Sequence, residues 1–155
     1  MQTLIRVLTP EDVAGYRTLR VEASYDPSFN TEPSLELGRP AGSLRHLLSA
    51  SRGFMLGAFA DNALVGMVGF GDGLAPNAGT LYGLFVARSA RRQHVATRLI
   101  CHLVRMAILS GRHRISLRVA EDNVGAIALY CREGFTLSST AAGELTFDLD
   151  ARPDD

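Results

Sequence analysis

The turn from Arg91 to Thr97 has the residue types and the position of an anion-binding site. It follows an apolar segment ending near Val86 and precedes an amphipathic helix. The first turn of a helix offers free backbone N–H groups and the positive end of the helix dipole, which together favour a phosphate. Taken alone, the segment fits a solvated basic helix start that binds nothing equally well. Positive charge concentrates here at Arg88, Arg91, Arg92 and Arg98.

The segment from Asn123 to Phe135 also spaces functional residue types along a helix. Asn123 is a favourable N-cap, and Gly134 suits the left-handed conformation that ends a helix. Tyr130 lies about two turns after Asn123, so both side chains face the same side. In isolation a helical tyrosine is more often a core residue than a catalytic one.

Together the two segments resemble the GNAT superfamily of N-acetyltransferases, over about Thr3 to Leu149. The family's phosphate motif, R/Q-x-x-G-x-G/A, aligns with Arg91, Arg92, Gln93, His94, Val95 and Ala96. It is weak alone, but a second motif, N-x-x-A-x-x-L-Y-x-x-x-G-F, is matched throughout. The second motif is carried by Asn123, Ala126, Leu129, Tyr130, Gly134 and Phe135.

One position departs from the phosphate motif, because His94 stands where the family has its first glycine. We expect binding to survive if His94 has a helical backbone, since the first helical turn needs no positive φ. The imidazole either points to solvent or adds a contact to phosphate.

The resemblance implies direct transfer of an acetyl group from acetyl-CoA to a primary amine, with no metal. In the family the strand before the phosphate turn splays from the next parallel strand, and the pantetheine arm enters the opening. By this resemblance the backbone N–H of Leu84 holds the thioester oxygen, and Tyr130 protonates the leaving thiolate. The implied coenzyme contacts are Phe85, Val86, Arg91, Arg92, Gln93, His94, Val95, Ala96, Thr97, Asn123 and Tyr130.

The general base and the acceptor remain open in the sequence. No carboxylate lies in Leu81–Leu84, and Tyr82, Glu22, Glu121 or a water chain are alternatives for the base. The acceptor is a small molecule or a protein amine. The loop Tyr25–Gly42 should cover the acceptor side, where Asp26, Glu32 and Glu36 either attract a cationic amine or form an ordinary solvated surface.

The elements that must position these residues follow from periodicity and turn signals. The order suits a mixed α/β sheet with helices on both faces. The family resemblance implies an α/β (α+β) domain over residues 1–150 whose central sheet of about seven strands is mostly antiparallel. A frayed tail over 151–155 follows. Strands are expected at 3–8, 53–60, 64–71, 80–87 (central and buried), 115–120, 135–139 and 145–149, and helices at 10–24, 43–51, 95–110 and 123–133, with a helical turn near Leu35.

Composition narrows the function classes. The chain has 155 residues, with 16 basic and 16 acidic side chains and no net charge, so nucleic-acid binding is disfavoured. It lacks both a signal-peptide pattern and the roughly 18-residue apolar run of a membrane span. Cys101 and Cys131 fit a reducing cytoplasm, and we expect both against helix cores. Many relatives form homodimers, so a homodimer is possible. The rival hypothesis is a module with this fold that binds acyl-CoA without turnover.

Overall fold

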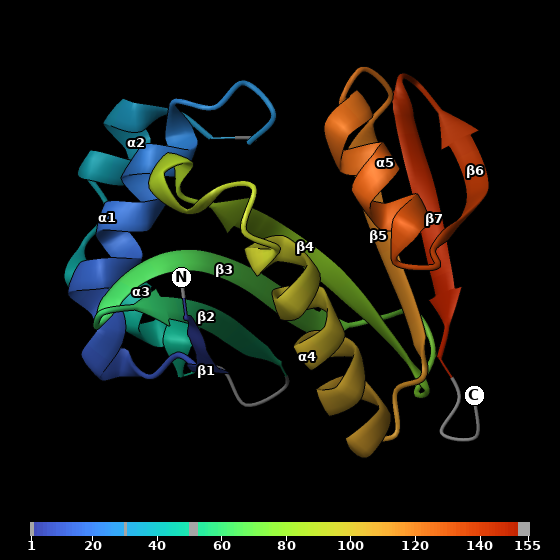
Figure 1. The fold of residues 1–155 in the computed structure, drawn as a ribbon, viewed down its shortest axis with the longest axis horizontal. Coiled ribbons are helices and arrows are strands. Elements are labelled where there is room, and N and C mark those ends of the chain that lie inside the picture. Colours follow the sequence, from blue (N-terminus) through green and yellow to red (C-terminus); the bar gives the residue numbers. More distant parts are fainter. Residues whose placement is uncertain (1, 30, 50–52, 152–155) are drawn as a thin grey trace.

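Seven strands form one sheet in the order β1-β2-β3-β4-β5-β7-β6 (Figure 1). The computed structural model describes residues 2–29, 31–49 and 53–151. Only β4 and β5 pair in parallel, so the predicted mixed, mostly antiparallel sheet is confirmed. The strands are β1 Leu4–Val7, β2 Phe54–Ala60, β3 Ala63–Asp72, β4 Ala78–Val86, β5 Arg114–Ala120, β6 Thr136–Ala141 and β7 Glu144–Asp150.

Helices cover both faces of the sheet, as predicted. On one face of the sheet, Gly57 of β2 lies next to Leu64, and Leu64 in turn lies next to Gly15 of α1. Helix α1 therefore covers this face. The next residue, Ala58, points to the opposite face, where α4 packs through Val95 and Leu99 around Gly66. The helices are α1 Val13–Ser24, α2 Pro33–Leu37, α3 Ala41–Leu48, α4 Val95–Leu109 and α5 Val124–Arg132, with 3-10 turns η1 Pro10–Asp12 and η2 Arg88–Ala90.

Local signals explain several element boundaries. The β2–β3 turn has positive φ at Asp61 and Asn62, 50° and 68°, as a tight hairpin requires. The Asp12 carboxylate accepts the Thr9 backbone N–H at 2.8 Å, which supports the predicted capping of the first helix. Gly111, just beyond α4, has φ of +83°, in keeping with its predicted role as a helix stop.

The segment predicted as a loop over 25–42 is more helical than expected. Pro33 begins α2, and Pro40 is the N-cap of α3. Proline suits the start of a helix because its missing N–H is not needed there. The helix predicted over Ser43–Ser51 starts earlier, at Ala41, and α3 ends at Leu48; the predicted end at Ser51 lies outside the described residues. The tail prediction also lies outside them, except for Ala151, whose N–H donates to the His113 carbonyl at 2.7 Å.

Two burial predictions were wrong. Cys101 and Cys131 are exposed rather than packed against helix cores. The buried stripe of α4 runs through Leu99 and Leu103, and Cys101 lies two residues, roughly 200°, away from Leu99. Strand β4 is central, but it is buried on alternate positions only: the Tyr82 side chain is 49% exposed. No helix in the described ranges is long and apolar enough to cross a membrane.

Candidate functional site

Strands β4 and β5 separate after a short parallel pairing. They pair only at Ala78–Arg114, Gly79–Ile115 and Thr80–Ser116. Beyond Thr80, β4 continues to Val86 and stays paired with β3 alone, so its other edge faces no strand. Figure 1 shows the two strands meeting at one end of the sheet and diverging toward the other. The sheet is therefore split beside the segment that sequence analysis singled out.

A bulge interrupts β4 at the split. Met67 of β3 pairs with Phe85 and Gly69 pairs with Tyr82, so Gly83 and Leu84 together oppose the single residue between them. Gly83 has φ of +64°, the left-handed conformation of a glycine-type bulge. The extra residue of a bulge is left out of the ladder, so polar backbone groups become available next to the open edge. Sequence reasoning missed this bulge, although a glycine inside an apolar strand is its usual signal.

The turn before α4 adopts a strained backbone. Arg92 and His94 both have φ of +62°, and His94 is the N-cap of α4 with ψ of 22°. The condition stated for binding, a right-handed helical backbone at His94, is therefore not met. A residue with a Cβ adopts the left-handed conformation here, at a cost of about 1–2 kcal/mol. Strain of this kind persists where the surrounding structure imposes it, often at ligand sites. The imidazole is exposed.

Backbone N–H groups are available at this turn. The first hydrogen bond of α4 runs from the Arg98 N–H to the His94 carbonyl at 3.0 Å. The N–H groups of His94, Val95, Ala96 and Thr97 therefore have no partner within the helix. They lie at the positive end of a 15-residue helix, so the turn can bind a phosphate without help from side chains.

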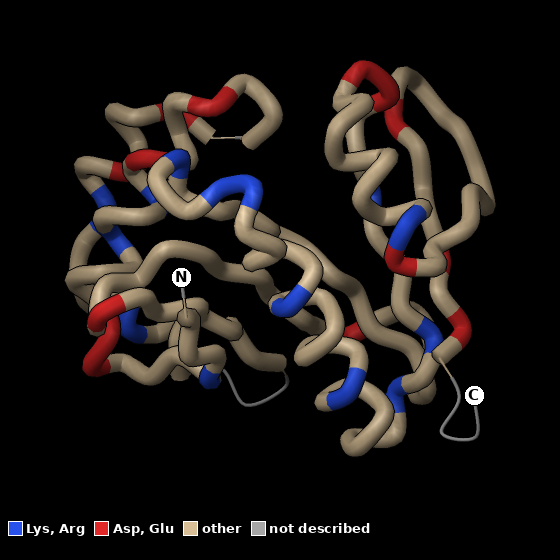
Figure 2. Tube along the Cα trace, viewed as in Figure 1, with Lys and Arg blue, Asp and Glu red and all other residues tan. Residues whose placement is uncertain are grey.

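The basic side chains near the turn have separate roles. Figure 2 shows basic residues at the turn before α4. The Arg91 guanidinium donates to the Val86 carbonyl at 3.1 Å and pairs with Asp26 at 3.3 Å. The Arg98 guanidinium donates to the carbonyl and hydroxyl of Thr3 on the N-terminal side of β1. All four arginines are exposed, but Arg91 and Arg98 hydrogen-bond within the fold.

Across the split lies α5 with Tyr130. The Tyr130 ring is 7% exposed and meets Phe135 edge to face at a centroid distance of 5.9 Å. Burial raises the pKa of Tyr130 to about 12, so the phenol stays protonated across the neutral range. Asn123 uses its side-chain oxygen to accept the Ala126 N–H at 3.3 Å, which is the N-cap role expected from its type.

Helices α4 and α5 come together at the turn that precedes α4. The Thr97 hydroxyl on α4 donates to Glu133, the residue after α5, at 3.3 Å. The Cys101 thiol, one helical turn later, lies 3.7 Å from the other oxygen of the same carboxylate. Glu133 therefore joins the two helices that flank the split, so the turn and Tyr130 belong to one region. Of the predicted coenzyme contacts, Phe85 and Val86 line the open edge of β4, while Arg92, Gln93 and Val95 complete the turn.

A pocket of about 680 Å³ opens beside the turn, on the α1 side of β4. Phe85 forms part of its wall and packs edge to face on Phe29 at 5.8 Å. Phe85 pairs with Met67, whereas its neighbour Val86 pairs with Gly66, which faces α4. Since neighbouring strand residues face opposite sides, this pocket and α4 lie on different faces of the sheet. Its polar lining is Glu22, Asp26, Arg88, Ser89 and Arg91.

The candidate bases are dispersed. Glu22 lines the pocket, and its carboxylate accepts the Arg88 backbone N–H at 2.9 Å. Tyr82 is half exposed on β4, and burial raises its pKa, so its phenol keeps its proton at neutral pH and is not free to accept another. Glu121 is exposed at the turn between β5 and α5. Among the described residues, His, Cys, Asp and Glu form no cluster that could hold a metal ion.

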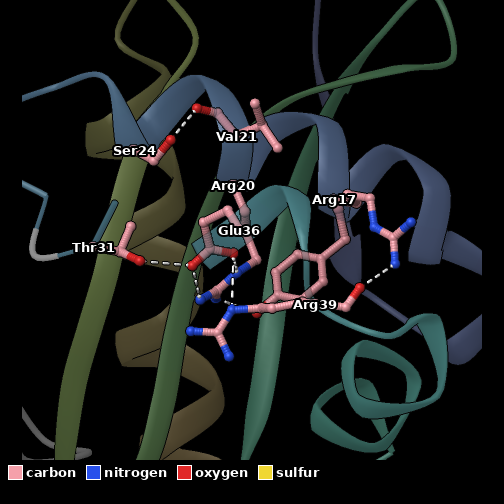
Figure 3. A network of polar contacts seen from close by, with 8 residues as sticks. Arg17, Arg20, Val21, Ser24, Thr31, Glu36 and Arg39 are labelled. Carbon is pink, nitrogen blue, oxygen red and sulfur yellow. Dashed lines mark hydrogen bonds and ion pairs between the residues drawn. The ribbon is translucent and has the colours of Figure 1, made fainter. Parts of the chain in front are cut away.

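A buried carboxylate fixes α2 against α1. Glu36 is 1% exposed and accepts hydrogen bonds from Arg20 at 2.8 and 2.9 Å, Thr31 at 2.9 Å and Arg39 at 3.0 Å (Figure 3). Burial opposes ionisation, but the donors outweigh it and lower the pKa of Glu36 to about 2. The prediction that Glu36 lies on a solvated loop surface or attracts an amine was therefore wrong. Spacing alone could not have paired it with Arg20.

Comparison with known proteins identifies the family. The model of the acetyltransferase (GNAT) family matches residues 16–135, so the chain belongs to this family. No curated protein matches the chain. The fold is that of GNAT acetyltransferases: a GNAT-family acetyltransferase from Streptococcus pneumoniae superposes with a TM-score of 0.83 at 18% identity, covering 97% of this chain and 99% of that one.

Two further solved structures share the fold. PaiA N-acetyltransferase from Thermoplasma acidophilum, in complex with coenzyme A, has a TM-score of 0.82 at 19% identity, covering 97% of this chain and 99% of that one. A ribosomal-protein-alanine N-acetyltransferase from Brucella melitensis has a TM-score of 0.77 at 20% identity, covering 94% and 98% of the two chains. At these identities the likeness establishes the fold alone.

Proposed function

We propose that the protein is an acetyl-CoA-dependent N-acetyltransferase that moves the acetyl group directly to a primary amine. The observation that carries this proposal is the split between β4 and β5, with α4 beside β4 and α5, which carries the buried Tyr130, beside β5 (Figure 1). Membership of the GNAT family, which uses acetyl-CoA, supports it.

The pyrophosphate of the coenzyme binds at the turn from Arg91 to Thr97. The backbone is left-handed at Arg92 and His94, and turns that combine such residues with right-handed ones form concavities of N–H groups that bind anions. These contacts are made by the backbone, so the missing glycine at position 94 does not remove them. The Arg92 side chain is exposed and can add a charge contact.

The pantetheine arm lies along the open edge of β4. The backbone of Phe85 and Val86 pairs with it as a neighbouring strand would. Asn123, across the split, contacts the arm from α5. The acetyl group lies at the bulge of Gly83 and Leu84, where the Leu84 N–H donates to the thioester oxygen as charge develops on it.

The reaction then needs one attack and a balanced set of proton transfers. The neutral amine nitrogen attacks the thioester carbon, the carbon–sulfur bond breaks, and Tyr130 donates its proton to the leaving thiolate. The phenol, with a pKa of about 12, carries this proton throughout the neutral range. The nitrogen of the product loses one proton and the tyrosinate regains one, either directly along a water chain between them or by exchange of each with solvent.

A thiol-release assay with acetyl-CoA over a panel of primary amines, with product masses measured in parallel, tests the proposal. We expect thiol release to depend on the amine and to match the amount of acetylated product. Coenzyme A binding without turnover on any amine would contradict the proposal and favour the rival, a non-catalytic acyl-CoA module of the same fold.

A further inference from the structure

We propose that the acceptor is a free α-amino acid, bound in the pocket beside η2 with its amino group at Glu22 and its carboxylate at Arg88. It binds as the ammonium and loses one proton to solvent before the neutral nitrogen attacks. This inference rests on the proposed function, whose acceptor it specifies. The pocket measures about 680 Å³ and opens on the face of the sheet away from α4. Phe85 in its wall directly follows Leu84, the proposed donor to the thioester oxygen.

The charges of the pocket fall into two sets. Asp26 and Arg91 pair with each other at 3.3 Å, and Asp26 also accepts the hydroxyl and N–H of Ser28 at 2.7 and 3.0 Å. This pair is satisfied within the fold. Because the Arg91 guanidinium also lies 5.5 Å from the centre of the Phe85 ring, it is held in place and stiffens the wall of the pocket.

Glu22 and Arg88 form the second set. The Glu22 carboxylate accepts the backbone N–H of Arg88 at 2.9 Å rather than its guanidinium. Within ranges 2–29, 31–49 and 53–151, neither side chain forms an ion pair. A carboxylate and a guanidinium thus line one pocket without forming an ion pair with each other, and the hydrogen bond to the Arg88 backbone holds the Glu22 carboxylate beside residue 88.

These two charges select the class of acceptor. A molecule with an ammonium and a carboxylate on adjacent atoms can satisfy both at once, and a guanidinium binds a carboxylate through two parallel hydrogen bonds. A polyamine meets Glu22 but is repelled by Arg88 and Arg91. The Tyr25 ring, 68% exposed at the same pocket, offers an apolar surface to the side chain of the amino acid.

Initial rates with saturating acetyl-CoA test this assignment. The probes are the standard L-amino acids, the carboxamide of each, dipeptides with the same first residue, and 1,4-diaminobutane. For the best amino acid we expect KM to be about 10- to 100-fold lower than for its carboxamide, as loss of a charged hydrogen-bonding partner implies. The variants are Arg88→Gln, Glu22→Gln and, as a control on α3, Arg45→Gln.

Arg88→Gln should raise KM for the amino acid by about 10-fold or more and leave KM for the carboxamide and for acetyl-CoA unchanged. Glu22→Gln keeps an oxygen for the Arg88 N–H but loses its charge, so it should raise KM for both amines. Arg45→Gln should match the wild type.

Three results would each overturn the inference while leaving acetyl transfer intact. They are equal KM values for the amino acid and its carboxamide, a preference for the dipeptide or the diamine, and a raised KM for acetyl-CoA in Arg88→Gln. Absence of turnover on every probe, with coenzyme A bound, would instead overturn the proposed function and this inference with it.

Discussion

Arg20 on α1 and Glu36 on α2 face each other through two hydrogen bonds of 2.8 and 2.9 Å between guanidinium and carboxylate. The same guanidinium donates to the Tyr16 hydroxyl at 3.0 Å, and Arg17 donates to the Arg39 carbonyl at 2.6 Å (Figure 3). This network ties α2 to α1. The segment between the two helices includes Asp26, which lines the pocket.

Replacing Glu36 with Gln should destabilise the fold. The change leaves the half-buried Arg20 guanidinium without a counter-charge, and breaking a buried pair in this way costs about 3–5 kcal/mol. The free energy of unfolding from urea titration measures it. Glu32→Gln is the matched control, because Glu32 is exposed and should change stability by less than about 0.5 kcal/mol. Equal values for the two variants would refute a structural role for the network.

The same carboxylate should make stability depend on acidic pH. Its pKa is about 2 in the folded chain against an ordinary value of 4.5, so the unfolded chain binds more protons between these values. The stabilisation by Glu36 is therefore fully present above pH 4.5 and is lost as pH falls toward 2. Unfolding free energies measured from pH 5 downward should fall less steeply in Glu36→Gln. Superimposable slopes would show that Glu36 does not titrate in this way.

His94→Gly should relieve the left-handed strain at the phosphate turn. We expect stability to rise by about 0.5–1 kcal/mol, since glycine adopts positive φ without a Cβ clash, and coenzyme A affinity to stay equal or improve. His46→Gly is the control, because His46 lies inside α3, where glycine should lower the free energy of unfolding by about 1 kcal/mol. Thermal unfolding and calorimetric titration measure both. A large loss of affinity in His94→Gly would mean that the imidazole itself contacts the coenzyme.

Gly83→Ala should damage the bulge of β4 through its backbone alone. A Cβ at Gly83 meets nothing within 4 Å, but φ is +64°, so we expect a loss of about 1–2 kcal/mol and slower acetyl transfer. Gly125→Ala is the matched control, because an added Cβ at Gly125 also meets no atom within 4 Å. Gly125 lies in α5 and has an ordinary φ, so this variant should gain up to about 1 kcal/mol in its free energy of unfolding. Equal changes in stability and in acetyl-transfer rate for the two variants would contradict the role given to the left-handed backbone at Gly83.

Much of this architecture could be predicted because its signals are local. The helix of α4 follows from Val95, Leu99 and Leu103 at four-residue spacing, and the Gly134 stop from its residue type. The order of the elements was enough to predict the seven-stranded sheet. The family resemblance, in turn, came from the second motif, which lies on one continuous helix and its ends.

The remaining features depend on partners that sequence does not reveal. The bulge at Gly83 depends on the register between β4 and β3, and the burial of Glu36 depends on Arg20, 16 residues away on another helix. The backbone of His94 is set by the turn around it rather than by its own preference. Cys101 was misplaced because its residue type is often buried, whereas its position on α4 lies off the apolar stripe.

The measurement that tests the account most directly compares kcat and coenzyme A affinity in the wild type and in Tyr130→Phe. The phenylalanine ring keeps the contact with Phe135 and removes only the hydroxyl. If the split between β4 and β5 carries out acetyl transfer with Tyr130 as its acid, kcat falls by about 100-fold or more while the Kd for coenzyme A is unchanged. An unchanged kcat, or an equal loss of affinity, would contradict that role.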